Sequence, residues 1–140
     1  MIRTIIIDDE AHIRDTFTRL LESFCPQVSL AGEACGVDDG IKVIKELHPD
    51  LILLDINMKD GTGFDLLNAF PEINFKVIFI SAFDKNTIRA FKLSGLEYLM
   101  KPVNPEEITA SINRVMNKEI KYFTLQLEAL QMNLRSVKAI

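Results

Sequence analysis

Acidic, basic and hydroxyl side chains follow four short apolar runs of this chain, and their types suit a hard metal ion and a phosphoryl group. Asp8 and Asp9 follow the first of these runs, and Asp55 follows a later one. Ser81 ends a further run, and Lys101 follows the last. If the runs are parallel strands, their carboxyl ends lie at one edge of the sheet, where ligands bind in open α/β proteins. We therefore expect these five side chains to form one site.

Three carboxylates at one site repel one another, and at least one pKa rises unless a cation lies among them. Oxygen ligands select a hard ion, and Mg²⁺ takes few protein oxygens and keeps waters that a phosphate can replace. Neither Cys nor His occurs at these strand ends, which disfavours Zn²⁺. With Lys101 as the opposing charge and Ser81 as a hydroxyl donor, the set could carry a phosphoryl group onto Asp55.

A purely structural role competes with this interpretation, because a single Asp at a strand end is often a helix cap or a turn residue. Asp8 or Asp9 alone could cap the helix that follows. The coincidence of acids, a hydroxyl and a lysine at four strand ends on one side of the sheet favours a functional site.

Five runs rich in β-branched and other apolar residues predict strands, at residues 3–7, 28–33, 51–54, 76–80 and 97–100. The first and third contain apolar stretches without alternation, as expected when helices cover both faces of a parallel sheet. Apolar residues three and four apart predict amphipathic helices between the runs. The alternation predicts an α/β fold with a doubly wound parallel sheet. A strand order of 2-1-3-4-5 would place the switch point between the first and third strands, where the aspartates meet.

Length and composition exclude several classes of protein. The chain has 140 residues, enough for one ordinary domain, and its 48% hydrophobic and 26% charged residues are typical of a folded globular protein. A net charge of −4 argues against direct binding to nucleic-acid phosphates. No apolar run suits a membrane span or a signal peptide, so we expect a cytoplasmic protein without membrane contact. Cys25 and Cys35 lack a zinc-site spacing and are expected to be reduced thiols.

Four motifs resemble the receiver domains of two-component response regulators. They are Ile5-Ile6-Ile7-Asp8-Asp9-Glu10, Pro49-Asp50-Leu51-Ile52-Leu53-Leu54-Asp55-Ile56-Asn57-Met58, Ile78-Phe79-Ile80-Ser81-Ala82-Phe83 and Tyr98-Leu99-Met100-Lys101-Pro102. The resemblance covers roughly residues 2–118 and implies a five-stranded parallel sheet of order 2-1-3-4-5, the flavodoxin or CheY-like arrangement. Less distinctive positions within residues 63–67, 81–84 and 88–92 most resemble the subfamily whose output is a LytTR-type (LytR/AlgR-like) DNA-binding domain.

The resemblance implies a phosphoacceptor and a metal site. Asp55 would accept the phosphoryl group, and Asp8, Asp9 and Asp55 would hold Mg²⁺ together with the backbone carbonyl of Asn57. Lys101 would pair with the phosphoryl oxygens and would precede a cis peptide bond to its proline, which X-Pro bonds adopt at modest cost.

The resemblance also implies a switch pair, Ser81 and Tyr98. The hydroxyl of Ser81 would move toward the phosphoryl group, and the Tyr98 ring would turn inward behind it. Plain core packing of Tyr98 is the alternative.

As a receiver, the chain would take its phosphoryl group from a sensor histidine kinase and catalyse only its own phosphorylation and dephosphorylation. It would control an output, expected to be transcription through a DNA-binding domain absent from this chain. A stand-alone receiver acting by protein–protein contact is the alternative. An aspartyl-phosphate phosphatase would need an acid where the chain has Asn57. A flavin-binding module would need a phosphate loop after the first strand, where residues 8–10 are acidic.

Departures from the motif concern the loop after the phosphoacceptor. The family often has Pro-Gly where this chain has Lys59-Asp60, which puts the rigidity of the loop in question. Phe83 is bulky, and we hypothesise that it hinders water and slows autodephosphorylation. His12 is expected at the surface, and His48 at the C-terminal end of its helix.

The C-terminal remainder is longer than a receiver needs. Residues 1–117 would form the receiver domain, and residues 118–140 a helical extension, expected to continue the last helix as one long rod. Apolar residues four and three apart form a coiled-coil-like seam in it, at Met116, Ile120, Phe123, Leu127, Leu130, Leu134 and Val137. The stripe needs a partner, either a second copy in a homodimer or the body of the same or a neighbouring receiver. In many response regulators such a helix links the receiver to its output domain.

Overall fold

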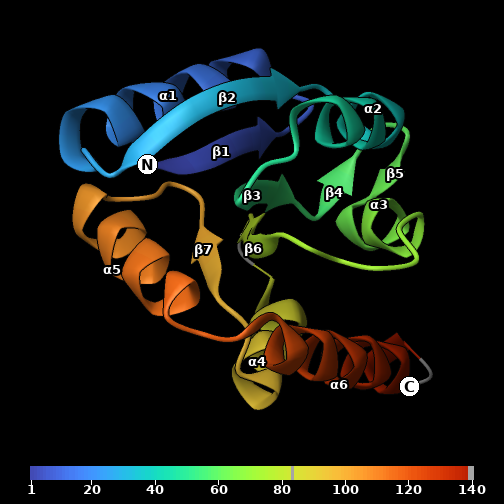
Figure 1. Ribbon diagram of the computed structural model, residues 1–140. Coiled ribbons are helices and arrows are strands. Elements are labelled where there is room, and N and C mark those ends of the chain that lie inside the picture. Colours follow the sequence, from blue (N-terminus) through green and yellow to red (C-terminus); the bar gives the residue numbers. More distant parts are fainter. Residues whose placement is uncertain (83, 139–140) are drawn as a thin grey trace.

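The computed structural model describes residues 1–82 and 84–138, with side chains as far as residue 132. Strands and helices alternate along most of the chain (Figure 1). Their order is β1 (Ile2–Ile7), α1 (Ala11–Phe24), β2 (Val28–Ala34), α2 (Val37–Leu47), β3 (Leu51–Asp55), β4 (Asn57–Met58), β5 (Gly61–Thr62), α3 (Gly63–Asn68), β6 (Lys76–Ser81), α4 (Lys85–Ser94), β7 (Tyr98–Met100), α5 (Pro105–Met116) and α6 (Ile120–Lys138).

The main sheet has five parallel strands in the order β2-β1-β3-β6-β7. This confirms the predicted α/β fold and the order 2-1-3-4-5, with β6 and β7 as its fourth and fifth strands. A separate two-stranded antiparallel hairpin, β4 with β5, follows β3 directly and was not predicted. The switch point lies between β1 and β3, as the sequence indicated.

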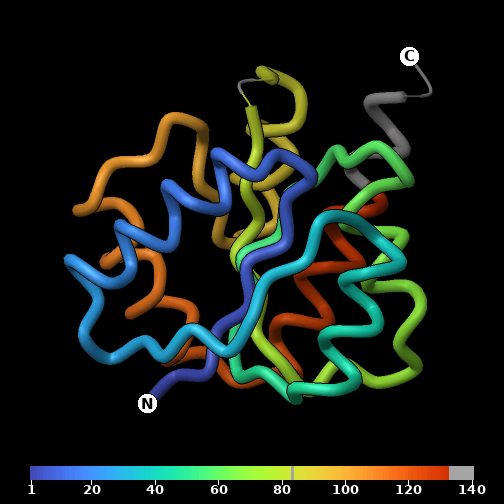
Figure 2. Tube along the Cα trace, turned by 90° about the horizontal axis from the view of Figure 1, so that it is seen from above, coloured from blue at the N-terminus to red at the C-terminus, as the bar shows by residue number. Residues whose placement is uncertain are grey.

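Helices cover both faces of the sheet, which is why β1 and β3 are nearly continuous apolar runs. Figure 2 shows α1 and α5 on one side, and α2, α3 and α6 on the other. Alternate residues of each strand face opposite layers: Ile6 and Leu53 pack toward α1 and α5, whereas Ile7 and Leu54 pack toward α2 and α3. All four side chains are fully buried. The strand ends that carry the candidate site are therefore fixed by two packed cores.

The predicted helix ends match local hydrogen bonds. Asn104 caps α5 by accepting a bond from the Glu107 N–H at 2.8 Å, and Pro105 occupies the first turn. Asp84 caps α4 in the same way. Gly95 ends α4 with a φ of 73°, a left-handed conformation that favours glycine.

The expectation of one unbroken C-terminal rod is wrong. Helix α5 ends at Met116, and α6 begins at Ile120 after a turn. Polar contacts hold this turn: the Lys76 ammonium donates to the Met116 carbonyl at 2.7 Å, and the Lys118 ammonium donates to the Gly95 carbonyl at 3.0 Å. The turn sends α6 back along α4, so that the two helices lie side by side (Figure 1).

The returning helix buries part of the predicted apolar seam against the chain's own core. Phe123, Leu127 and Leu130 are buried and belong to the same cluster as Phe79 of β6 and Phe91 of α4. Met116 is half-buried at the opposite layer, and Ile120 is 36% exposed. The remaining seam positions, Leu134 and Val137, lie outside the residues whose side chains are described. Burial against the same chain removes these three apolar side chains of the seam from water without a second copy.

Within the described residues, no helix is both long and apolar enough to cross a membrane.

Candidate functional site

Three carboxylates meet where β1 and β3 end. Asp8 and Asp9 follow β1, and Asp55 is the last residue of β3. These strands are hydrogen-bonded neighbours, with Ile7 opposite Leu54, so the sheet register brings the three residues together. Each offers an oxygen within 4.8 Å of the others, as the sequence predicted.

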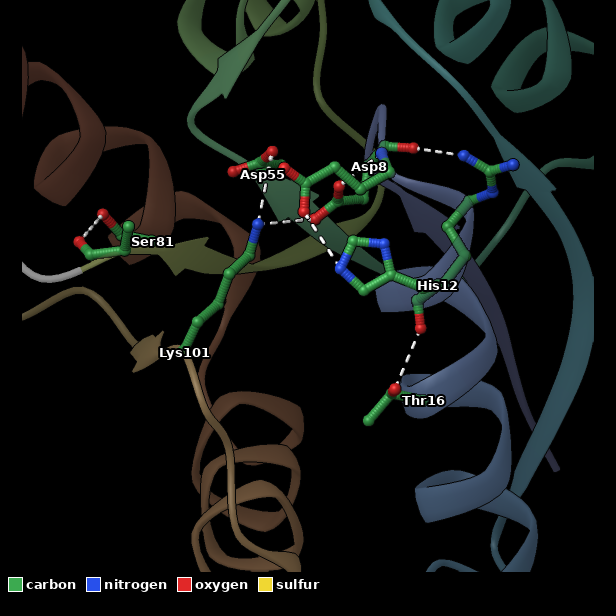
Figure 3. Close-up of polar contacts among 9 residues, drawn as sticks. Asp8, His12, Thr16, Asp55, Ser81 and Lys101 are labelled. Atoms are coloured by element: carbon green, nitrogen blue, oxygen red, sulfur yellow. Dashed lines mark hydrogen bonds and ion pairs between the residues drawn. The ribbon is translucent and has the colours of Figure 1, made fainter.

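Lys101 reaches into this cluster from the end of β7. Its ammonium lies 2.9 Å from Asp8 Oδ2 and 3.6 Å from Asp55 Oδ2 (Figure 3). Its backbone N–H donates to the carbonyl of Ser81 at 2.8 Å, which fixes the segment beside β6. The Lys101–Pro102 peptide bond is cis, as predicted. One lysine thus faces two of the three carboxylates.

The cluster shifts the ionisation of its members. Burial, and next the charge of Asp8, raise the pKa of Asp55 to about 6, against opposing contributions from Lys101 and the Asn57 backbone N–H. Burial lowers the pKa of Lys101, but its ion pair with Asp8 and the charge of Asp55 outweigh this, so the net pKa is raised. The lysine therefore stays charged at neutral pH, whereas an additional cation would ease ionisation of Asp55.

The donor set fits a hard cation. Asp8 Oδ2 is a buried oxygen that faces Lys101 but accepts no hydrogen bond of good geometry, so it retains capacity for a ligand bond. Asp9 is half-buried and Asp55 is 5% exposed, so the cluster is reachable from solvent on one side. Oxygen donors alone match Mg²⁺ rather than zinc.

Asp8 is held in place by its surroundings. Its Oδ1 accepts a bond from the Glu10 N–H at 2.9 Å, and its backbone carbonyl accepts one from the Arg14 guanidinium at 2.6 Å. Neither Asp8 nor Asp9 is the N-cap residue of α1; that position is Glu10, whose side chain makes no capping bond. The purely structural alternative of an N-cap aspartate is thus not what the geometry shows.

Asn57 lies in β4, two residues after Asp55. Its backbone N–H makes a small contribution that lowers the pKa of Asp55, so the first residue of the hairpin lies beside the candidate phosphoacceptor. The role predicted for its backbone carbonyl as a metal ligand remains a prediction.

The two predicted switch residues are not in contact with the carboxylates. The Ser81 hydroxyl is turned away from Asp55 and donates to the carbonyl of Ala82 at 2.7 Å (Figure 3). Tyr98 is half-buried in a row of rings, its centroid 5.3 Å from that of Phe91, which lies 5.1 Å from Phe79. This packing agrees with the core alternative for Tyr98 and leaves its switch role a prediction.

Other residues singled out in the sequence lie as follows. His12 is 76% exposed, with Nε2 3.5 Å from Glu10 Oε2, and takes no part in the cluster. His48 ends α2 in a left-handed conformation with φ of 47°. Phe83 lies outside the described residues.

Two contributors near the site were missed by sequence reasoning. Arg14 bonds the Asp8 carbonyl and Glu33, and Asp60 bonds the start of α2. An arginine on an amphipathic helix gives no signal of such a contact. The replacement of the family's Pro-Gly by Lys59-Asp60 marked Asp60 as unusual. It did not indicate which groups Asp60 contacts, because the start of α2 lies more than 20 residues earlier in the chain.

Comparison with known proteins agrees with this geometry. The family model described as response regulator receiver domain matches residues 4–113. An uncharacterized response regulatory protein of Vibrio parahaemolyticus is 38% identical over 133 residues, which cover 93% of this chain and 54% of that protein. The sensory transduction protein LytT of Bacillus cereus is 30% identical over 116 residues, 81% of this chain and 47% of that protein. The chain thus spans about half the length of the curated relatives it matches.

Solved structures show the same fold. A LuxR-family DNA-binding response regulator of Staphylococcus aureus matches with a TM-score of 0.71 at 25% identity, covering 84% of this chain and 100% of that one. The signal receiver domain of the putative response regulator NarL of Mycobacterium tuberculosis gives 0.70 at 28% identity, covering 84% and 98%.

Proposed function

The chain belongs to the response regulator receiver domain family, the signalling switches of two-component systems, and from this premise we propose that Asp55 is the phosphoacceptor. The observation that carries the proposal is the buried Asp55 carboxylate with Asp8 and Asp9 beside it and the Lys101 ammonium 3.6 Å away. Phosphoryl transfer depends mainly on positioning and charge neutralisation, which this arrangement supplies.

Asp8, Asp9 and Asp55, with the backbone carbonyl of Asn57, would hold Mg²⁺. When bound, the ion supplies positive charge for the oxygens of the transferred group. The unfilled capacity of Asp8 Oδ2 and the raised pKa of Asp55 support a cation at this place.

The donor in this proposal is a phosphohistidine of a sensor kinase. An Asp55 oxygen attacks phosphorus, a new P–O bond forms, and the P–N bond breaks with its electron pair going to the imidazole. Lys101 approaches the phosphoryl oxygens from the β7 side and stabilises their charge. Hydrolysis of the acyl phosphate returns Asp55 to its carboxylate. The chain thereby acts on itself and turns over no metabolite.

The conformational response starts at Ser81 in this proposal. Its hydroxyl exchanges the bond to the Ala82 carbonyl for one to the phosphoryl group, and Tyr98 follows by turning inward. Ser81 ends the strand that carries Phe79, and Phe79 packs on Phe91 of α4. The change would thus reach α4 through packed rings.

Residues 1–117 would be the receiver, and residues 118–140 a helical extension that links it to an output domain. The matched relatives are about twice as long as this chain, and one of them, in Escherichia coli, is the transcriptional regulatory protein BtsR. We propose that the output is transcription through a LytTR-type DNA-binding domain. Homodimer formation also stays a proposal; while α6 is docked, Phe123, Leu127 and Leu130 are not free to contact a second copy.

Phosphorylation can be tested with acetyl phosphate as a small donor. Wild type is incubated with Mg²⁺ or with EDTA, and intact mass spectrometry follows the gain of one phosphoryl group. Asp55→Asn is the test variant, and Asp15→Asn, on an exposed face of α1, is the matched control. We expect modification of wild type and Asp15→Asn with Mg²⁺ only, and none of Asp55→Asn. Modification of Asp55→Asn at the wild-type level would overturn the proposal.

A further inference from the structure

The N-terminus of helix α2 is capped by a residue that is distant in the sequence, Asp60. Its N-cap residue is Gly36, which has no side chain, and the Asp39 side chain turns back to the Cys35 N–H at 3.0 Å. The first two helical N–H groups donate instead to Asp60, Val37 to Oδ1 at 2.9 Å and Asp38 to Oδ2 at 3.2 Å. Both oxygens of one carboxylate are therefore used to satisfy a helix terminus.

Gly36 leaves the space for this contact. A Cβ built on Gly36 would lie 2.6 Å from Asp60 Oδ1, closer than carbon and oxygen approach without displacement. Its φ of 179° is extended backbone that any residue can adopt. The requirement for glycine is therefore one of room for the carboxylate.

Asp60 lies in the turn of the β4–β5 hairpin, between Met58 and Gly61, which pair across it. The same hairpin begins at Asn57, two residues after Asp55, and the Asn57 backbone N–H favours the ionised form of that carboxylate. At its other end, Thr62 enters α3 through a reciprocal capping box with Asp65. The hairpin is thus fastened to α3 at one end and to α2 through Asp60 at its turn.

We infer that Asp60 is a positioning residue for phosphorylation: by tying the β4–β5 hairpin to the start of α2, it holds the Asn57 backbone against Asp55 and the metal. The inference rests on the proposed function. The family motif often places proline where this chain has Lys59, and proline restrains the backbone by fixing φ. Here the link from Asp60 to α2 takes over that restraint.

The charge of Asp60 suits this role. The backbone N–H groups of Val37 and Asp38 hold its pKa below the usual range, so it remains a carboxylate at neutral and mildly acidic pH. Asp60 is not part of the cluster of Asp8, Asp9 and Asp55, and both of its carboxylate oxygens accept bonds from the start of α2.

The test compares Asp60→Ala and Asp60→Asn with Asp39→Ala, which removes the same charge from the same helix end without touching the hairpin. The initial rate of phosphorylation by acetyl phosphate is measured against Mg²⁺ concentration. We expect Asp60→Ala to raise the half-saturating Mg²⁺ concentration at least five-fold, roughly 1 kcal/mol, and Asp60→Asn, which keeps one acceptor oxygen, to lie between it and wild type. Asp39→Ala should stay within about two-fold.

Gly36→Ala tests the contact between Asp60 and α2 by a change in α2 instead of in the hairpin. It should displace the Asp60 carboxylate and so reproduce the Asp60→Ala phenotype without removing any acidic residue from the sequence. Circular dichroism confirms that each variant is folded, and titration with Mg²⁺ alone by calorimetry measures the metal site without any phosphoryl donor. If wild type binds Mg²⁺ but is not phosphorylated, the proposed function fails and calorimetry still decides the inference. A folded Asp60→Ala protein with wild-type Mg²⁺ affinity overturns it.

Discussion

The Lys101 ammonium lies nearer to Asp8 than to Asp55, at 2.9 Å against 3.6 Å. Asp8 has no solvent exposure, so in the absence of a metal ion this lysine is the main charge that compensates it. Lys101 therefore stabilises a buried carboxylate at rest, and in the proposed function the same ammonium would also meet the phosphoryl oxygens at Asp55.

Replacing Lys101 should destabilise the metal-free protein. Lys101→Ala leaves a buried carboxylate without its partner, and breaking such a pair costs about 3–5 kcal/mol when both groups are buried; Lys101 is 19% exposed, so we expect about 2–3 kcal/mol. Urea unfolding at neutral pH in EDTA measures it, with Lys42→Ala on the exposed face of α2 as control. Mg²⁺ should recover part of the loss. Equal stability of the two variants in EDTA would contradict the role assigned to the pair.

Removing the charge of Asp55 should stabilise the metal-free protein at neutral pH. Burial, followed by the charge of Asp8, raises its pKa from 3.8 to about 6. The stabilising contribution of the protonated group is therefore full below about pH 4 and is lost as the pH rises through 6. Asp55→Asn should gain about 1–3 kcal/mol at neutral pH, and the gain should vanish near about pH 4. Unfolding curves across this range in EDTA test it; a gain that grows toward acid pH would have the wrong sign.

Mg²⁺ should raise the thermal stability of the protein through the three carboxylates. A ligand that binds only the folded state at about 100 times its dissociation constant adds about 2.7 kcal/mol. Asp9→Asn removes one half-buried oxygen ligand, so its melting temperature should respond to Mg²⁺ much less than that of wild type. Asp15→Asn, on the exposed face of α1 and outside the cluster, serves as the control. An undiminished Mg²⁺ response of Asp9→Asn would exclude that residue as a ligand.

The docking of α6 on the receiver core should be visible in stability. Leu130 is fully buried and Leu125 is 61% exposed on the same helix. Leu130→Ala should cost about 2–5 kcal/mol, whereas Leu125→Ala should stay within about 0.5 kcal/mol. Chemical unfolding of both variants measures the difference. If the two leucines proved equally dispensable, α6 would not pack as described.

Much of the fold could be predicted because buried parallel strands leave a plain pattern in the sequence. The strands around Ile6 and Leu53 are apolar on both faces, and the polar residues that follow them mark the sheet edge where ligands bind. The cluster of Asp8, Asp9, Asp55 and Lys101 follows from strand order alone. Local pattern and topology were sufficient for this part.

Contacts between segments distant in sequence could not be predicted in the same way. The apolar stripe of α6 indicates that one face must be covered, but helical spacing is the same whether the cover is a second copy or Phe91 of the same chain. The sequence around Asp60 predicts a turn, but it does not indicate that the Asp60 carboxylate accepts a hydrogen bond from the Val37 N–H. The orientation of the Ser81 hydroxyl depends on a rotamer, which residue type does not determine.

The role of Asp55 as phosphoacceptor is tested most directly by identifying the aspartate that carries the phosphoryl group. The folded protein is incubated with acetyl phosphate and Mg²⁺, and borohydride then reduces any acyl phosphate to an alcohol that peptide mass spectrometry can locate. We expect reduction at Asp55, with Asp8 and Asp9 unchanged. Reduction at Asp8 or Asp9, or at no aspartate of the folded protein, would contradict this role.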